Sequence, residues 1–173
     1  GVFGALGALV ALWGRSANGG EGQEVDLALY ESLFRLLEFV PIGYDQTGEV
    51  RRRNGNTHPY VAPSSTYETS DGEYLTMTAS TPSVWERLCR AMDRENLLDD
   101  ERFADNAARV DHSDEVNGVV REWVGERTRE EVAEAFDAHD VAYGFAYDVA
   151  DVFADDHYRA REAMVRVPDG SLH

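Results

Sequence analysis

The apolar positions at the start of the chain follow a helical period, then a strand-like stretch, then a second helical period. Residues 1–14 are almost wholly apolar and predict a buried helix. One stripe of this helix carries three glycines: Gly1, Gly4 and Gly7. Because helical glycine is costly, this repetition predicts the close approach of another backbone. Residues 23–27 predict a short strand and residues 30–40 a one-sided helix, an order that fits the edge of an α/β layer.

Periodicity is lost over residues 41–63, which are rich in Gly, Pro, Asn and other polar residues. A connection of this length without regular structure is usually functional or lies between domains. Beyond it, Tyr and β-branched residues stand on both sides of Asp71-Gly72, and this pattern predicts a β-hairpin.

Three further helices are predicted from their start signals. These are a Thr-Pro-Ser start at residues 81–83, a His-Ser-Asp start at 112–114 and a capping box at 128–131, where Glu follows Thr by three residues. Large aromatic residues on the apolar helical positions are predicted to be core: Trp85, Trp123, Phe136 and Phe153.

The last part of the chain predicts short elements. A strand is expected over residues 141–146, short helices over 148–153 and 156–163, and the start of a final strand over 164–168. Together with the hairpin and the three helices, the region from about 62 to 150 is predicted to be a compact α+β lobe.

The charge balance is unusual, with 33 acidic against 16 basic residues, a formal net charge of −17 and no lysine. Such a surface repels nucleic acid and anionic membranes, so neither is an expected partner. The acidic residues are dispersed rather than gathered in one tail, which indicates a solvated surface. This composition resembles that of salt-accumulating halophiles, where the screening length falls to ~3 Å at 1 M salt. We therefore expect the protein to lose structure at low salt.

The single Cys89 excludes an internal disulfide framework and a multi-cysteine metal site, and it fits the cytoplasm. The apolar first stretch has no basic flank and is shorter than the ~20 residues of a membrane span. Because the chain starts inside an apolar helix without a cap, it is predicted to be an internal part of a longer protein.

Other polar groups carry no clear metal signature. The histidines His112, His139 and His157 stand singly, without the spacing of a zinc site. The acidic runs at 99–101 and 155–156 are interpreted as charges at helix starts, where the helix dipole favours them.

Candidate chemistry is concentrated in residues 51–59, where three arginines precede Gly55-Asn56 and His58-Pro59. The arginines could hold phosphates, because their forked donors match phosphate geometry. The simpler interpretation is that they are linker charges that pair with the acidic surface. For residues 55–59, the simpler interpretation is a turn in which Gly supplies a positive φ and Pro supplies rigidity.

Several phrases occur in an order that resembles the class III CoA-transferases, the group of formyl-CoA and carnitine CoA-transferases. They are GEGQEVDLALYESLF, RRNGNTHPYVAPSSTYETSDGEYL, WERLCRAM, LLDDERFADNAARVDHSDEV and WVGERTREEVAEAFDAHDVAYGFAYDVADVFADDHYRAREAMV. The resemblance covers nearly the whole chain. It implies an α/β protein with a large Rossmann-like domain that binds CoA, a small α+β domain inserted in it, and two chains interlocked as a homodimer.

On that plan the chain divides into four parts. Residues 1–40 would end the first half of the large domain, and 41–61 would form a linker. Residues 62–150 would be the small domain, and 151–173 the return linker with the start of the final strands.

The resemblance also implies the chemistry. Family members move CoA between carboxylic acids through an aspartate that forms a mixed anhydride and then an aspartyl-CoA thioester. That aspartate is expected just before Gly1, so no catalytic residue is assigned here, and neither Asp26 nor Asp45 is given the role. Coenzyme A thioester is a substrate, acyl-CoA and carboxylic acids are the partners, and no covalently bound cofactor is implied. The chain alone is predicted to be inactive.

By the same resemblance, Gly55, Asn56, His58 and Pro59 lie at the mouth of the active site and bind substrate. A stiff loop there would exclude water from the anhydride, which hydrolysis would waste. A role for His58 as general base is a separate hypothesis that the transfer mechanism does not need.

Two other functions stay open. One is the related α-methylacyl-CoA racemase branch, an isomerase that uses acid and base residues instead of an aspartate nucleophile. The other is a non-catalytic, acidic halophilic binding module that shares only the fold. The Gly-Asn-Thr-His-Pro phrase favours the transferase.

Overall fold

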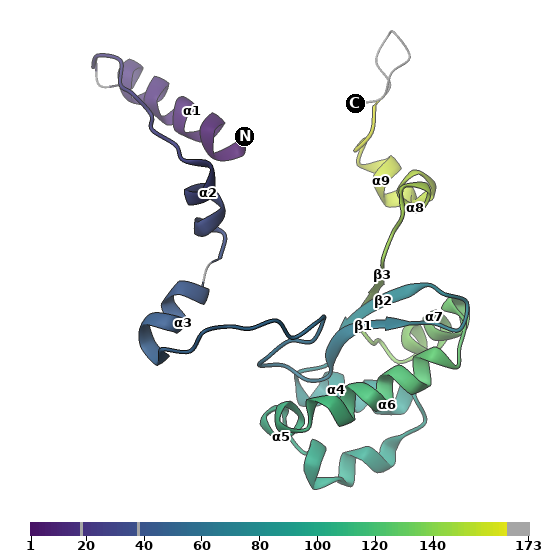
Figure 1. The fold of residues 1–173 in the computed structure, drawn as a ribbon. Helices are drawn as coiled ribbons and strands as arrows, with labels where there is room; N and C mark the ends of the chain where they lie inside the picture. Colours follow the sequence, from purple (N-terminus) through teal and green to yellow (C-terminus); the bar gives the residue numbers. More distant parts are fainter. Residues whose placement is uncertain (18, 38, 166–173) are drawn as a thin grey trace. The chain divides into compact units, whose positions relative to one another are not determined.

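The computed structural model describes residues 1–17, 19–37 and 39–165 of the chain. It divides into two compact units, the first over Gly1–Arg53 and the second beginning at Asn54 (Figure 1). The four-part division predicted from the resemblance stays a prediction.

The first unit consists of three helices joined by extended chain: α1 Val2–Ala17, α2 Leu29–Arg35 and α3 Phe39–Thr47. The helix predicted at the start of the chain is confirmed, but the prediction that it is buried is wrong. None of the three helices has a buried residue, because the described residues of this unit place no second layer over their apolar faces. No helix in the described ranges has the length and apolar character that crossing a membrane requires.

The segment at residues 23–27 is extended but pairs with no strand among the described residues, so the predicted strand is not formed here. Its side chains lie on the glycine stripe of α1. A Cβ at Gly7 would lie 3.0 Å from Val25 Cγ1, and one at Gly4 would lie 3.3 Å from Leu27 Cδ2. The two glycines therefore permit a close approach, but by the side chains of Val25 and Leu27 and not by the backbone that their spacing predicted.

The helix predicted over residues 30–40 is divided in two, and the predicted loop begins later than expected. α2 ends at Arg35, and α3 runs through Pro41 to Thr47. Pro41 lies in the first turn of α3, where its missing N–H is not needed by the helix. Reading this proline as the end of regular structure was wrong.

The second unit is built on a three-stranded antiparallel sheet in the order β1-β2-β3: β1 Ser64–Glu68, β2 Tyr74–Thr78 and β3 Tyr143–Phe145. In the hairpin Tyr67 pairs with Leu75 and Ser65 with Met77, and these four side chains form the buried face. The predicted hairpin and the predicted third strand are confirmed.

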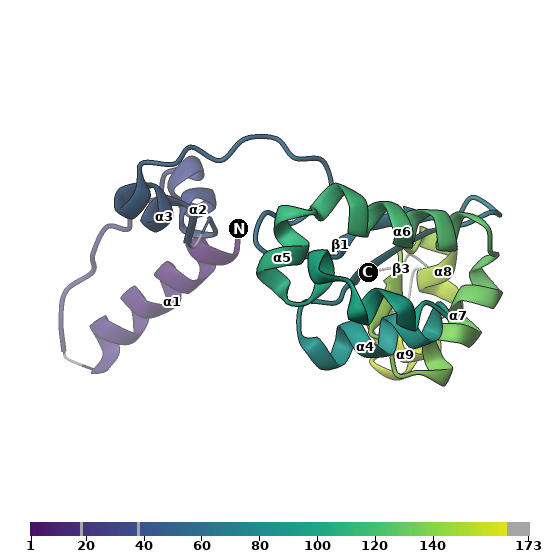
Figure 2. The ribbon, with the colours of Figure 1, turned by 90° about the horizontal axis from the view of Figure 1, so that it is seen from below.

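Helices cover the buried face of this sheet (Figure 1 and Figure 2). Two short 3₁₀ helices, η1 and η2, lie among these α-helices. In chain order the elements are α4 Pro82–Ala91, η1 Glu95–Asp99, η2 Glu101–Phe103, α5 Asn106–Asp111, α6 Ser113–Gly125 and α7 Arg129–Ala138. The predicted starts are confirmed. The Thr81 side chain accepts from Val84 N at α4, and Thr128 and Glu131 form both halves of a capping box at α7.

The core of this unit is aromatic and aliphatic. Trp85 meets Phe103 edge to face at 6.1 Å, and Trp123 stacks on Phe136 at 5.5 Å between ring centroids. Of the residues predicted to be core, Trp85, Trp123 and Phe136 are buried, but Phe153 is 41% exposed. It lies in α8 Val149–Ala154, which has no buried residue, so the prediction for Phe153 was wrong.

The chain continues from α8 into α9 Asp156–Ala160, so both short helices predicted near the end are present. Of the final strand predicted over residues 164–168, the first two residues are not in a strand and the rest lie outside the described residues.

Candidate functional site

The site loop, residues 54–60, lies just before β1 in the second unit. Its turn is closed by two reciprocal hydrogen bonds. Asn54 Nδ2 donates to the Thr57 carbonyl at 2.6 Å, and Thr57 Oγ1 donates to the Asn54 carbonyl at 2.7 Å. Gly55 has φ 66°, the left-handed conformation that glycine adopts without steric cost. The turn predicted from the sequence is confirmed.

His58 is exposed, and the backbone orients its ring. The Tyr60 N–H donates to His58 Nδ1 at 3.2 Å, and the two rings meet edge to face at 6.0 Å. Because Nδ1 accepts this bond, the neutral ring carries its proton on Nε2. His58 therefore offers an N–H donor through Nε2.

Two side chains of α5 hold the end of the site loop, and sequence reasoning missed both. Asn106 Nδ2 donates to the Tyr60 carbonyl at 2.9 Å, while Asn106 Oδ1 accepts from Ala62 N at 3.3 Å. Arg109 Nε donates to the Ala62 carbonyl at 2.8 Å. The only sequence signal for Arg109 is an arginine within an otherwise apolar helical pattern.

Arg109 is completely buried, which is rare for an arginine. Its terminal nitrogens donate to the carbonyls of Phe103 at 2.9 Å and Ser80 at 2.8 Å, and its guanidinium lies 5.2 Å from the centre of the Trp85 ring. Burial lowers the pKa of Arg109 from its ordinary value. The charge is compensated by carbonyl dipoles from three separate segments of the chain.

The start of β1 is held in the same way by Asn117 of α6. Its Oδ1 accepts from Ser64 N at 3.2 Å and from the Tyr67 hydroxyl at 2.6 Å, while its Nδ2 donates to the Ser113 carbonyl at 2.8 Å. Burial raises the pKa of Tyr67, so its hydroxyl stays a proton donor. The chain from Tyr60 to Tyr67 is therefore fixed by polar side chains of α5 and α6.

The three arginines that precede the site loop belong to the first unit and are exposed. The guanidinium of Arg51 lies over the ring of Phe39 at 4.6 Å from its centre. Their interpretation as linker charges stays a prediction.

The acidic runs act as helix caps, as predicted. Asp100 accepts from Arg102 N at the start of η2, and Asp155 accepts from the amides of His157 and Tyr158 at the start of α9. These hydrogen bonds hold the pKa of both carboxyls below the ordinary value; for Asp100 the Arg102 side chain contributes most. In the described part of the chain, no group of three or more His, Cys, Asp or Glu is arranged to hold a metal ion.

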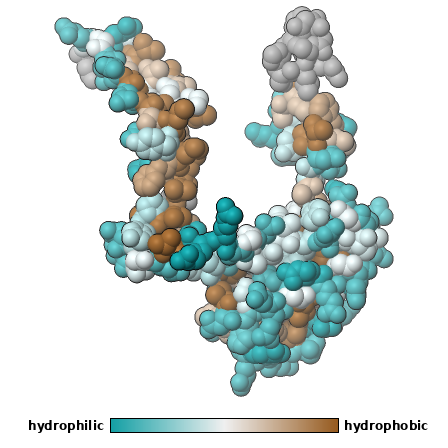
Figure 3. All heavy atoms as spheres, in the orientation of Figure 1, coloured by the Kyte–Doolittle hydropathy of each residue, from teal (hydrophilic) through white to brown (hydrophobic). Residues whose placement is uncertain are grey.

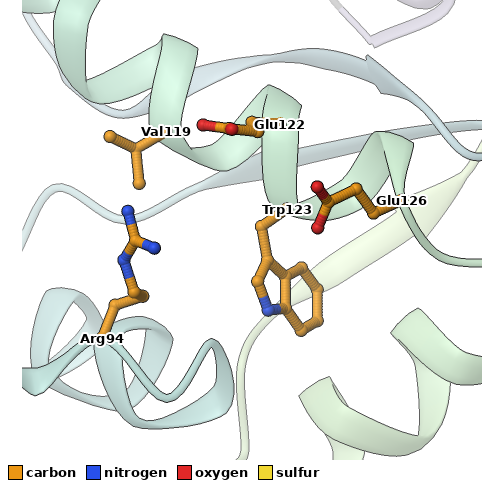
Figure 4. Close-up of a pocket in the computed structure, with 5 residues that line it drawn as sticks. All are labelled: Arg94, Val119, Glu122, Trp123 and Glu126. Atoms are coloured by element: carbon orange, nitrogen blue, oxygen red, sulfur yellow. The ribbon is translucent and has the colours of Figure 1, made fainter.

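A small pocket of about 110 Å³ lies between α6 and the turn after α4, with Trp123 at its base and the Arg94 guanidinium pointing toward α6 (Figure 4). Its lining is Arg94, Val119, Glu122, Trp123 and Glu126. Ligand pockets usually measure roughly 300–1,000 Å³, so this one suits a few water molecules. It shares no residue with the site loop or its anchors.

A larger hollow of about 400 Å³ belongs to the first unit. Its lining is mostly apolar: Phe34, Leu37, Val40, Pro41, Tyr44, Glu49, Val50 and Arg51. It is formed by the uncovered faces of α2 and α3 and by the chain that follows them. Neither pocket contains Gly55, Asn56, His58 or Pro59, although the larger one is lined in part by Arg51.

Comparison with known proteins places the chain in a family. The chain matches CoA-transferase family III over residues 1–173 and belongs to that family. It is 36% identical over 99% of its length to the succinyl-CoA–D-citramalate CoA-transferase of Chloroflexus aurantiacus, and covers 42% of that protein. It is 31% identical over 96% of its length to the succinyl-CoA:mesaconate CoA-transferase of Haloarcula marismortui, covering 41%. The chain thus spans about two fifths of these relatives.

Among solved structures, a CAIB/BAIF family protein from Brucella suis matches 99% of this chain and 45% of its own, with a TM-score of 0.83 and 30% identity. The family resemblance and the mixed α/β class predicted from the sequence are confirmed.

Proposed function

We propose that the intact protein, meaning the whole polypeptide that carries this sequence, is a CoA-transferase that moves CoA between carboxylic acids. The observation that carries this proposal is the match to family III along the whole chain, with relatives named as CoA-transferases at up to 36% identity. Because these relatives are named for succinyl-CoA and a second dicarboxylic acid, we take succinyl-CoA as the donor and a C4 or C5 dicarboxylate as the acceptor.

The proposed reaction is a double exchange on one aspartate, which lies outside residues 1–173. Its carboxylate attacks the thioester carbonyl, and the CoA thiolate leaves to give a mixed anhydride. The thiolate then attacks the aspartyl carbonyl, which releases succinate and forms aspartyl-CoA. The acceptor carboxylate and the thiolate repeat both steps in reverse, and the free aspartate returns. Covalent carriage of this kind divides one difficult exchange into easier steps.

In this reaction Gly55, Asn56, His58 and Pro59 line the substrate site. A loop that stays closed over the anhydride protects it from water, because hydrolysis would end the cycle. Two observations support this role: the turn is closed by its own hydrogen bonds, and the ring of His58 presents Nε2–H as a donor.

The remaining expectations are part of the same proposal. The intact protein acts in the cytoplasm of a halophile as a homodimer, with CoA thioester as substrate and no covalently bound cofactor. The absence of lysine and the net charge of −17 support a saline setting. The relatives' names favour the transferase over the racemase branch and over a non-catalytic binding module.

The test is to supply the intact protein with succinyl-CoA and either citramalate or mesaconate, and to follow new acyl-CoA by chromatography. We expect transfer to at least one acceptor, with succinate released in equal amount. Epimerisation of a 2-methylacyl-CoA without transfer would establish the isomerase instead. Transfer by residues 1–173 alone would contradict the placement of the nucleophile outside them.

A further inference from the structure

We propose that Asn106 and Arg109 are positioning residues that hold the site loop in its water-excluding conformation, so that loosening them turns CoA transfer toward thioester hydrolysis. This inference rests on the function proposed above. It adds residues of α5 that lie 44 to 47 positions away along the chain from the backbone groups they bind.

Asn106 binds both ends of a three-residue segment. Its Nδ2 donates to the Tyr60 carbonyl and its Oδ1 accepts from Ala62 N, so one planar amide fixes the spacing between these two backbone groups. Asn106 is also the first residue of α5, and the Asp105 side chain caps that helix by accepting from Ala108 N at 2.8 Å. The amide is thus presented by a capped helix rather than by a loop.

The link from Asn106 to the ring of His58 runs through the backbone of one residue, Tyr60. Asn106 holds the carbonyl of Tyr60, and the N–H of the same residue donates to His58 Nδ1. His58 also forms an isolated bridge with Val61. The position of the Tyr60 backbone therefore determines where the imidazole lies and in which direction Nε2–H points.

Arg109 fixes the next residue, Ala62, against two more distant segments. Its three nitrogens donate to Ala62, Phe103 and Ser80, and Ser80 directly precedes the Thr81 cap of α4. A buried charge is costly to keep, and a well-packed apolar residue often stabilises such a position as well or better. A guanidinium that is bound to three carbonyls supplies a fixed geometry instead, which a lysine with its single nitrogen cannot reproduce.

The experiment uses the intact protein and measures two rates with succinyl-CoA: transfer to the acceptor acid and hydrolysis to free CoA. The variant is Asn106→Ala, in which both hydrogen bonds are removed at a half-buried position. We expect the ratio of hydrolysis to transfer to rise about tenfold, since small misplacements of reacting groups carry costs of this order or more. Arg109→Lys is the second variant, and it should move the ratio in the same direction.

Val132→Ala is the matched control, because Val132 is buried in α7 and is not bonded to the loop or its anchors. It should lower the unfolding midpoint and leave the ratio unchanged. A further double variant, Asn106→Ala with His58→Ala, should raise the ratio no more than His58→Ala alone, because Asn106 acts by positioning the imidazole that His58→Ala already removes.

The outcomes separate the two proposals. Wild-type protein that shows no transfer to any acceptor overturns the proposed function. If the wild type is active, an unchanged ratio in Asn106→Ala overturns the positioning role. A ratio that rises equally in Val132→Ala, in step with the loss of stability, overturns it as well. If Asn106→Ala does not fold, Arg109→Lys decides by the same criterion.

Discussion

The two units of the chain differ in their charge and in how much of their apolar surface is buried. Residues 1–53 carry seven acidic residues against five arginines, and none of their helices has a buried side chain. Residues 54–173 carry 26 acidic residues against eleven arginines and enclose an aromatic core. In Figure 3, hydrophobic atoms are extensive on the visible side of the first unit, though mixed with hydrophilic ones, and hydrophilic atoms predominate over the sheet and the helices that cover it in the second unit.

The comparison separates two kinds of stability. On α1, the large apolar side chain of Trp13 is 75% exposed. Large exposed apolar patches normally belong to an interface. The second unit encloses a core of its own, in which Val132 and Phe136 are fully buried, and therefore carries most of its stability within itself. Its acidic residues are dispersed along its sequence.

The largest expected effect comes from separating the units. Residues 54–165 produced alone should unfold in one cooperative thermal transition, because their core is complete in itself. Residues 1–53 alone should show little helix and no transition, since short helices without packing are marginal in water. Circular dichroism during heating measures both. A cooperative transition in residues 1–53 would remove the distinction.

A pair of phenylalanine substitutions tests the same contrast at single residues. Phe136 is fully buried, stacks on Trp123 and meets Tyr143 edge to face at 5.4 Å, so Phe136→Ala should cost about 3–5 kcal/mol of unfolding free energy. Phe34 of the first unit is 57% exposed, so Phe34→Ala should change it by less than about 0.5 kcal/mol. Denaturant titration of residues 1–173 gives both values, and equal losses would contradict the contrast.

Salt should affect the second unit more than the first. Its self-repulsion is screened over ~3 Å at 1 M salt but over tens of ångströms in dilute solution. The unfolding midpoint of residues 54–165 should therefore fall by several degrees or more between molar and millimolar KCl. Calorimetry at matched pH measures the shift. An unchanged midpoint would end the halophilic interpretation of the composition.

The smallest expected effect is on acid stability. The Thr69 hydroxyl donates to Asp71, and the Arg129 N–H at the start of α7 does so as well; together they hold the pKa of that carboxyl below its ordinary value. Because the folded pKa is the lower one, this stabilisation is complete above the ordinary aspartate pKa and is lost as pH falls through the folded value. Asp71→Asn should flatten the fall of unfolding free energy over that acidic range. A slope equal to that of wild type would show that Asp71 contributes nothing.

Local signals explain which parts of the fold could be predicted. The hairpin at Asp71-Gly72, the Thr81 cap and the Thr128 capping box each depend on residues a few positions apart, so the sequence displays them directly. The start of α3 was missed because Pro41 was interpreted as a break rather than as a first-turn residue. Phe153 was predicted to be buried because periodicity reports an apolar face but not whether another layer covers it.

In the site, too, features set by neighbouring residues could be predicted, and features set by distant residues could not. The turn at Gly55 follows from residue types within five positions. The anchors Asn106 and Arg109 could not be predicted, because their partners are backbone groups, and a carbonyl has no identity in the sequence. Only the fold shows that α5 lies against Tyr60 and Ala62.

The binding of Asn106 and Arg109 to backbone atoms has a consequence for how the site can vary by substitution. Asn106 and Arg109 bind main-chain atoms of Tyr60 and Ala62, so they act on the backbone whatever side chains stand at residues 55–59. Under the proposed function, substitutions in the loop would change which acid is accepted, while Asn106 and Arg109 would hold the backbone in the same place. On this proposal, the side chains of the site loop and the anchors of its backbone can vary independently, so substrate preference could change without a change in the fold of the second unit.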